Sequence, residues 1–245
     1  MIEGLNSAAA GMVAQRQKMD AVANDLANTS TTGYKQVRVG FRDLAYSQAG
    51  KASELGVRTG AGAAAVDAGR RMTQGALQRT DRPLDVAVQG EGFLQVTLAD
   101  GRPALTRDGA LHLDGQGRLS TGLGGLVRPP LKLPPGTPES SIGIGPDGTV
   151  TAAGRVVGRL QLVSVRSPQL MQSLGDNAFA PTAQSGPVAA APRNTVLTQG
   201  ALEASNVDVA EAMVSMIEAQ RAFELASKAI HTADQMMEIA NGVKR

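Results

Sequence analysis

A seven-residue repeat of apolar side chains at both ends of this 245-residue chain is the feature that most restricts its fold. Near the C-terminus, a large apolar residue recurs every seven positions, and an alanine follows each of them three positions later. A strict period of seven is typical of left-handed helix pairing, because it keeps one stripe of a helix facing its partner. The pattern therefore favours paired helices over a helix packed on the chain's own β domain. The C-terminal row consists of Val209, Ala212, Met216, Ala219, Phe223, Ala226, Ile230, Ala233, Met237 and Ala240.

The N-terminal segment carries a shorter row with the same period, formed by Leu5, Met12, Met19 and Leu26. This helix should stop by residue 28, because residues 29–33 combine β-branched side chains with a glycine that can take a positive φ. At the other end, Ser205 and Asp208 match a capping box and would begin the C-terminal helix near residue 205. We interpret the two rows together as the assembly interface of the chain.

The region between the helices has β character. Asp-Gly recurs four times, with its aspartates at positions 100, 108, 114 and 147, and apolar alternation flanks these pairs. Asp-Gly favours the type I′ turn of antiparallel hairpins. The sequence thus predicts an α+β fold with paired N- and C-terminal coiled-coil helices and a central antiparallel β-rich domain. The predicted parts are an assembly helix at 1–30, an extended linker at 31–75, the β-rich domain at 76–192, a second linker at 193–204 and an assembly helix at 205–245.

Composition and motifs exclude several classes of function. The chain has no cysteine and a net charge of only +2, so neither thiolate metal sites nor bulk attraction to nucleic acid is expected. No run is long enough to span a membrane, and the first residues lack the pattern of a cleaved signal peptide. The basic stretch 35–82 is interpreted as a solvated, loosely structured segment rather than a polyanion site.

No arrangement of residues resembles a catalytic, metal-binding or cofactor-binding site. His112 and His231 are far apart in sequence, and neither has ligand-like neighbours. Asp108 and Asp114 lie in turn dipeptides, and the Gly90-Glu91-Gly92 run lacks the third glycine of a dinucleotide fingerprint. We therefore expect no enzyme activity and no cofactor.

Runs of residues at both ends and in the middle resemble a known family. Residues 8–12 (AAAGM), 19–29 (MDAVANDLANT) and 32–35 (TGYK) resemble the N-terminal signature of bacterial flagellar rod and hook proteins. Residues 202–209 (LEASNVDV) and 213–224 (MVSMIEAQRAFE) resemble the C-terminal signature, and residues 85–93 and 106–109 also match. Asp25 departs from the usual asparagine, so it keeps an acceptor but loses an amide donor. The signature residues that we single out are Asn24, Asn28, Gly33, Tyr34, Ser205 and Asn206.

The resemblance implies a structural subunit of the flagellar basal-body rod, without a cofactor, that polymerises into the helical drive shaft carrying motor torque to the hook. Residues 220–223 and 234–237 look most like the distal rod type. A proximal rod or hook-type subunit is the alternative, since residues 82–86 and 157–160 resemble the proximal type. The implied partners are copies of the chain, other rod proteins, the hook protein and ring proteins. The implied location is the basal body in the cell envelope, reached through the flagellar type III export apparatus.

Two functions of other classes remain as rivals. One is an adhesin or binding module in which the β domain sits on a helical stalk. Such a module needs a concave aromatic-lined site, and the chain has only four Phe, two Tyr and no Trp. The other rival is a soluble enzyme, which the lack of a polar constellation disfavours.

Overall fold

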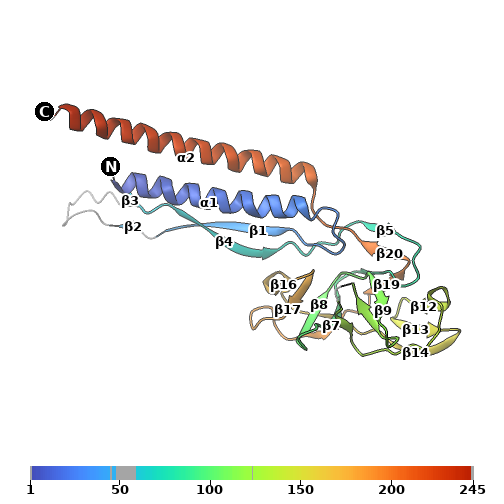
Figure 1. Ribbon diagram of the computed structural model, residues 1–245. Helices are drawn as coiled ribbons and strands as arrows, with labels where there is room; N and C mark the ends of the chain where they lie inside the picture. The colour runs from blue at the N-terminus through green and yellow to red at the C-terminus, as the bar shows by residue number, and fades with distance from the viewer. Residues whose placement is uncertain (1, 45, 48–58, 123, 244–245) are drawn as a thin grey trace. The chain divides into compact units, whose positions relative to one another are not determined.

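A computed structural model describes residues 2–44, 46–47, 59–122 and 124–243 (Figure 1). The chain forms two units, each described here by itself. Unit 1 comprises Met1–Ala27, Val37–Ala68 and Asp208–Arg245, and unit 2 comprises Asn28–Gln36 and Gly69–Val207. The chain therefore leaves unit 1 after α1, returns to it at residues 37–68, and returns a second time for the final helix.

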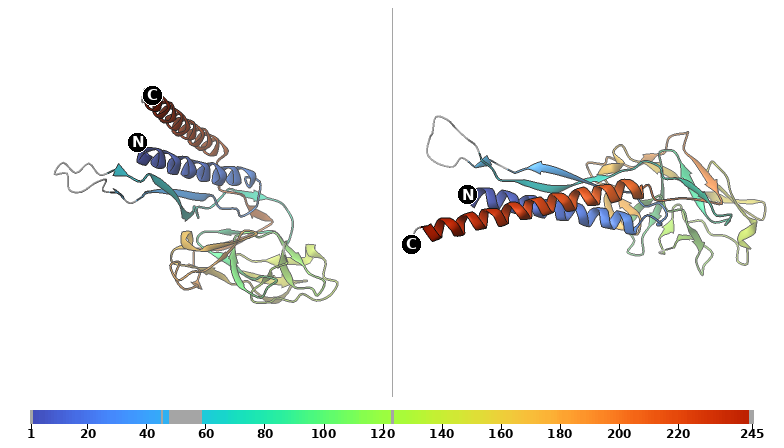
Figure 2. Two further views of the ribbon diagram at one scale, coloured as in Figure 1. Left: turned by 60° about the vertical axis from the view of Figure 1, so that its left-hand side comes forward. Right: turned by 90° about the horizontal axis from the view of Figure 1, so that it is seen from above.

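Unit 1 is built on two long helices, α1 (Ile2–Ala27) and α2 (Val209–Val243), that pack together. The prediction of two packed terminal helices is confirmed. α1 lies between α2 and a two-stranded ribbon of β1 (Val37–Asp43) and β4 (Ala63–Arg70), as Figure 1 and the left view of Figure 2 show. β2 (Tyr46–Ser47) and β3 (Thr59–Gly60) form an antiparallel pair between β1 and β4 in the sequence.

The segment 31–75, which we assign to an extended linker from the sequence, instead contributes this ribbon to unit 1. β4 is rich in alanine and contains a single large apolar residue, whereas β1 carries Val37, Val39 and Phe41 at alternate positions, as a strand does. β1 and β4 pair with each other and β1 packs on α1, so their order comes from backbone pairing and from the helix. The second predicted linker, 193–204, is also paired, because β19 and β20 lie within it.

Unit 2 is the central antiparallel β-rich domain that the sequence predicts. Its largest sheet has nine strands, with the order β16-β17-β8-β7-β11-β10-β9 and with β15 joining β7 to β18. β12, β13 and β14 form a second sheet, while β19 pairs with β6 and β20 with β5. The strands are β5 (Leu77–Arg79), β6 (Val86–Gln89), β7 (Phe93–Thr97), β8 (Pro103–Thr106), β9 (Leu111–Leu113), β10 (Leu119–Thr121), β11 (Leu126–Val127), β12 (Ile142–Ile144), β13 (Thr149–Ala152), β14 (Arg155–Arg159), β15 (Leu162–Ser164), β16 (Gln172–Gly175), β17 (Ala178–Ala180), β18 (Ala189–Ala190), β19 (Val196–Gln199) and β20 (Ala201–Glu203), with short 3-10 helices at Glu139–Ser141 and Pro168–Leu170.

Two apolar clusters form the core of unit 2. The larger consists almost entirely of Leu, Val, Ile and Ala, including the fully buried Leu84, Leu94 and Leu111. The smaller gathers Phe93 and Phe179 with Leu105 and other residues. Two of the few aromatic rings are thus placed in one small core. Aliphatic side chains fill the remainder, consistent with the composition.

The Asp-Gly pairs do not form the type I′ turns that we predict from the sequence. At Asp100-Gly101 the amide of Gly101 donates to the carbonyl of Leu98 at 2.9 Å, and only the glycine has a positive φ, of 84°. A type I′ turn would need a positive φ at both central residues, whereas a type I turn followed by one left-handed residue gives the observed three-residue loop. The loop at Asp147-Gly148 follows the same scheme.

Gly109 and Gly115 are the second residues of Asp-Gly pairs, and neither has a positive φ. A Cβ on Gly109 would lie 1.6 Å from the carbonyl oxygen of Val86, whereas a Cβ on Gly115 would meet nothing within 4 Å. We predict that Gly109→Ala lowers the free energy of unfolding of unit 2 by about 1–3 kcal/mol or more, because the backbone must shift to relieve the overlap. Gly115→Ala should be nearly neutral in the same chemical denaturation measurement. Equal stability of the two variants would contradict the close approach of residue 109 to β6.

Candidate assembly site and the junction of the signature motifs

The C-terminal heptad row lies on the face of α2 that packs on α1. Ala212 and Ala219 are buried, with 2% and 1% of their surface exposed. Val209 departs from the pattern because its side chain is exposed, and the side chain of Ala240 lies outside the described residues. The other members are half-buried, namely Met216, Phe223, Ala226, Ile230, Ala233 and Met237. The alanine row thus supplies the closest part of the helix contact near the start of α2.

The N-terminal row is less completely covered. Leu5, Met12 and Met19 are half-buried, and Leu26 is exposed near the end of α1. The most buried apolar residue of α1 is Ala14, which does not belong to the row. α1 packs against both α2 and β1, and a helix with two packed sides needs a wider apolar face than one heptad stripe supplies. An ion pair of 4.0 Å between Lys18 and Glu218 also links the two helices.

A second set of apolar residues on α2 remains exposed. Val209, Met213 and Ile217 are spaced by four residues, so they follow one side of the helix, and Val214 lies next to them. Their exposed fractions lie between 43% and 57%. We call these four residues the outer apolar face. Leu225, Met236 and Ile239 are also exposed farther along α2. Except for Val209, these exposed residues lie outside the heptad repeat, so the repeat did not identify them.

The α2 helix begins three residues later than the capping box predicts. Asp208 is the capping residue, and its Oδ1 accepts hydrogen bonds from the amides of Ala210 at 2.8 Å and Glu211 at 3.1 Å. Ser205 Oγ accepts from the amide of Val207 at 3.3 Å, outside the helix. The sequence pattern predicts Ser205 as the N-cap, but the N-cap is Asp208, the other polar residue of the predicted box. Both side chains carry an oxygen that can accept from a helical amide, so the pattern alone does not distinguish them.

A buried ion cluster joins three signature segments within unit 2. Lys35 and Glu203 have no exposed side-chain surface and form an ion pair. Arg107 donates to the second carboxylate oxygen of Glu203 at 3.2 Å and to the carbonyl of Gly90 at 2.6 Å. Its guanidinium lies 5.2 Å from the centre of the Phe93 ring. The N-terminal, middle and C-terminal signature runs of the chain thus each contribute one residue to a single cluster.

Burial away from water has the largest effect on the pKa of Lys35 in this cluster. Burial lowers the pKa of the Lys35 ammonium below its ordinary value, while the Glu203 carboxylate raises it and the Arg107 guanidinium lowers it. The Lys35 ammonium also donates to the carbonyl of Thr73 at 2.8 Å, and the amide of Gly75 donates to Glu203 at 2.8 Å. The buried Lys35 ammonium can stay charged only because these oppositely charged and hydrogen-bonding partners are close to it. Lys35, Arg107 and Glu203 belong to motifs that are far apart in the sequence. No regular spacing between these residues could have predicted their contact.

The N-terminal signature residues lie in and directly after α1. Gly33 has a φ of 68°, as expected for a residue that ends the turn after α1. Tyr34 is buried beneath the Arg70 guanidinium, which lies 5.6 Å from the ring centre. Asn28 accepts a hydrogen bond from the Thr31 hydroxyl at 3.1 Å, and Asn24 is exposed on α1. Asp25 uses the acceptor that it shares with asparagine, because its Oδ1 accepts from the amide of Val37 at 3.0 Å.

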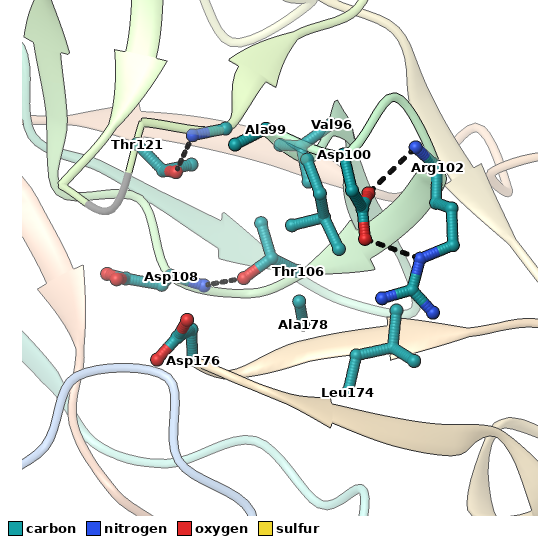
Figure 3. A pocket seen from close by; sticks show the side chains of 12 residues that line it. Val96, Ala99, Asp100, Arg102, Thr106, Asp108, Thr121, Leu174, Asp176 and Ala178 are labelled. Carbon is teal, nitrogen blue, oxygen red and sulfur yellow. Dashed lines mark hydrogen bonds and ion pairs between the residues drawn. The ribbon is translucent and has the colours of Figure 1, made fainter.

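Unit 2 also has a small pocket of about 270 Å³ that is lined by apolar and acidic side chains (Figure 3). Val96 and Leu174 line its apolar part. Asp176 and Asp108 lie on one side, and Asp100 is held by an ion pair of 2.6 Å with Arg102. Among the residues with described positions, no group of three or more His, Cys, Asp or Glu is arranged to hold a metal ion.

Asp108, one of the acidic residues of this pocket, has a raised pKa. Burial raises the pKa of its carboxyl above the ordinary value, and the Asp85 carboxylate adds to the rise. Hydrogen bonds from the amide of Ala110 at 3.2 Å and from the Thr32 hydroxyl at 2.9 Å act in the opposite direction. Asp108 therefore holds a turn against the segment that follows α1, and this role explains the residue without catalysis.

Comparison with known proteins agrees with this arrangement of helices and signature motifs. Three family descriptions match successive parts of the chain. They are "Flagella basal body rod protein" at residues 5–35, "Flagellar hook protein FlgE/F/G D1 domain" at residues 87–152 and "Flagellar basal body rod FlgEFG protein C-terminal" at residues 198–243. The chain belongs to the flagellar basal-body rod and hook family, whose members are structural components of the flagellum.

Full-length relatives specify the member of the family. The chain is 38% identical to the flagellar basal-body rod protein FlgG of Borreliella burgdorferi over the full length of both chains. It is 39% identical to FlgG of Buchnera aphidicola subsp. Schizaphis graminum, with 97% of this chain and 98% of the relative covered, and 34% identical to FlgG of Caulobacter vibrioides, with 99% and 100% covered. It is therefore a FlgG-like distal rod protein and a structural subunit of the rod that serves motility.

The helix start can be tested with two substitutions. Asp208→Ala should destabilise the first turn of α2 by about 1 kcal/mol, because two helical amides lose their acceptor. Ser205→Ala removes a hydroxyl that accepts only from the loop, so the helix should be unaffected. Faster amide exchange at Ala210 and Glu211 in the first variant alone is the expected result. The reverse order of effects would restore the capping box as predicted from the sequence.

The raised pKa of Asp108 predicts a pH dependence of stability. A carboxyl whose pKa is higher in the folded state favours folding below its unfolded pKa, and this contribution is lost as the pH rises through the folded pKa. Asp108→Asn should remove that loss, so the variant should gain stability relative to the wild type at neutral pH and not in acid. Asparagine Oδ1 can still accept both hydrogen bonds that reach Asp108 Oδ1. Calorimetric unfolding between about pH 4 and pH 7 measures the difference, and an equal decline in both proteins would contradict the assignment.

Proposed function

We propose that this subunit polymerises into the helical drive shaft of the flagellar rod through the exposed parts of its terminal helices. In this proposal the pairing of α1 with α2 within one chain provides a stiff element, and the outer apolar face contacts a neighbouring copy. The subunit acts mechanically and not as an enzyme. Its partners are copies of itself along the shaft, other rod proteins, the hook protein at one end and the ring proteins around it.

The observation that carries the proposal is the outer apolar face formed by Val209, Met213, Val214 and Ile217. Most of the heptad row of α2 is used against α1, whereas these four residues form the exposed apolar group nearest the start of α2 that remains for another molecule. A cluster of exposed apolar side chains on one side of a helix is typical of a contact surface. The exposed polar residues beside it, including Gln220 and Arg221, would form the rim of such a contact.

The geometry of assembly follows from the kind of contact. A chain that uses one surface to bind a different surface of the next copy makes a heterologous contact, and repetition of that contact generates a filament when the rotation does not close. The two heptad rows supply paired helices, which we interpret as a short coiled coil. A shaft made from such pairs resists bending because each helix is supported along its length by its partner.

Cellular placement in the proposal follows from the family. The subunit would reach the basal body in the cell envelope through the flagellar type III export apparatus, without a cleaved signal peptide. In the portion of the chain with described coordinates, neither helix is sufficiently long and apolar to cross a membrane. An adhesin-type function receives less support, because neither of two pockets in the described part of unit 2 is lined by an aromatic ring.

Substitution of the outer apolar face tests this proposal directly. Met213→Glu and Ile217→Glu place charges at positions that are about half exposed in the monomer, so the fold should remain intact. In an assembled shaft each charge would be buried without a partner, at a cost of several kcal/mol. We expect both variants to remain folded by circular dichroism but to lose filament growth in a sedimentation assay and swimming in cells.

The matched control is Ala229→Glu, which adds the same charge to an exposed position of α2 outside the outer apolar face and its rim. It should support normal filament growth. Normal assembly of both the Met213→Glu and Ile217→Glu variants would refute the outer apolar face as the contact between copies.

A further inference from the structure

The chain passes between the two units at four points, which follow residues 27, 36, 68 and 207. Three segments of unit 2 lie next to these points, and we call them the crossing segments. They are residues 28–36, 69–76 and 203–207. An isolated extended segment can rotate about its φ and ψ angles, so it transmits twist poorly. Any twisting load carried through the chain must pass along these segments.

Glu203 binds the other two crossing segments through one carboxylate. It pairs with the ammonium of Lys35 from the first segment and accepts from the amide of Gly75 in the second at 2.8 Å. The backbone repeats this arrangement, because the amide of Gly33 donates to the carbonyl of Glu203 at 2.8 Å. A single buried side chain thus holds all three crossing segments together.

Asn206 makes a second set of contacts among the same segments. Its Oδ1 accepts from the amide of Gln36 at 2.8 Å, and its Nδ2 donates to the carbonyls of Arg71 at 2.7 Å and Thr73 at 3.1 Å. Both ends of one amide are therefore used, one on each neighbouring segment. The geometry needs a side chain with a donor and an acceptor, which aspartate and alanine cannot provide.

The β-rich part of unit 2 anchors this arrangement through Arg107. The guanidinium binds the Glu203 carboxylate and the carbonyl of Gly90, so it joins the crossing segments to the end of β6. The crossing segments are therefore fixed both to one another and to the β-rich domain. Hydrogen bonds to buried charges are stronger than neutral ones, and they impose directions that apolar contacts do not.

We propose that Glu203 and Asn206 form a torsional clamp that makes the crossing segments resist twisting as one body. This inference rests on the proposed function, because a clamp of this kind has a use only in a subunit that carries torque. Three segments held side by side at several levels cannot rotate independently, whereas three separate segments can. The clamp residues are positioning residues, and they are distinct from the outer apolar face.

The test replaces the chromosomal copy of a motile strain with Glu203→Gln or Asn206→Asp. Each change retains the size of the side chain and removes part of the clamp. The expected result is normal yield of rods in isolated basal bodies and swimming in dilute medium, with loss of swimming in viscous medium, where the torque is high. The control is Asp100→Asn, which alters a carboxylate that pairs with Arg102 in its own hairpin and should swim normally in both media.

A rescue experiment separates mechanical weakness from other defects. Ala201 and Arg79 are direct neighbours in the antiparallel pairing of β20 with β5, a spacing that accepts a disulfide. The natural chain contains no cysteine, so the two introduced residues can pair only with each other within one subunit. Arg79→Cys with Ala201→Cys in the Asn206→Asp background should restore swimming in viscous medium, and a membrane-permeable reductant should abolish the rescue. Ala201→Cys alone should not rescue.

Two results would overturn the clamp. One is swimming of both clamp variants in viscous medium at the wild-type rate. The other is absence of rods from both variants, which would assign these residues to folding or assembly. Neither result bears on the proposal that the outer apolar face contacts a neighbouring copy. That proposal would be refuted by normal filament growth of the Met213→Glu and Ile217→Glu variants. The two proposals can therefore fail separately.

Discussion

The pairing of the buried Glu203 carboxylate with Lys35 is the interaction on which the arrangement of the signature motifs depends. Removal of two charged groups from water costs several kcal/mol for each ion, and only close partners return this cost. Lys35 and Glu203 have no exposed side-chain surface, so a chain segment that moved away would leave an unpaired buried charge. An apolar contact in the same place could be as stable, but it would tolerate sliding. The ion pair therefore contributes mainly a defined geometry.

The helix pair of unit 1 is held by a different kind of contact. Small side chains at Ala212 and Ala219 allow the backbones of α1 and α2 to approach closely, and the partly buried methionines and Phe223 fill the spaces beside them. Because the two helices pair with each other within the chain, most of the repeat is covered, while Met213, Val214 and Ile217 outside the repeat and Val209 within it stay exposed. In the proposed assembly, the covered part of the repeat holds the subunit together, and the exposed apolar residues of α2 contact a neighbour.

The period of the apolar residues was sufficient to predict both helices, their pairing and the β character of the middle, since these depend on local patterns. In the ribbon, the alanines and glycine of β4 carry little strand signal, and its order comes from pairing with β1. The alternation of Val37, Val39 and Phe41 in β1 is a strand signal, but it is short and was not separated from the linker around it. The cluster of Lys35, Arg107 and Glu203 could not be derived for a related reason. Its residues are brought together by the topology of unit 2, and no pairwise spacing along the chain encodes that proximity. The type of turn at each Asp-Gly pair depended on the loop length, which the dipeptide alone does not specify.

The division of unit 1 between the two ends of the chain has a consequence for the order of folding. The whole of residues 28–208 separates α1 from α2, so their contact has a high contact order and a large entropic cost of closure. All of unit 2 precedes α2 in the sequence, and it can therefore fold while that helix is still being delivered. α1 has no helix to pair with until the last segment arrives. In the proposed assembly, a chain that lacks its last segment also lacks the outer apolar face, so the position of α2 in the sequence would keep incomplete copies out of the growing structure.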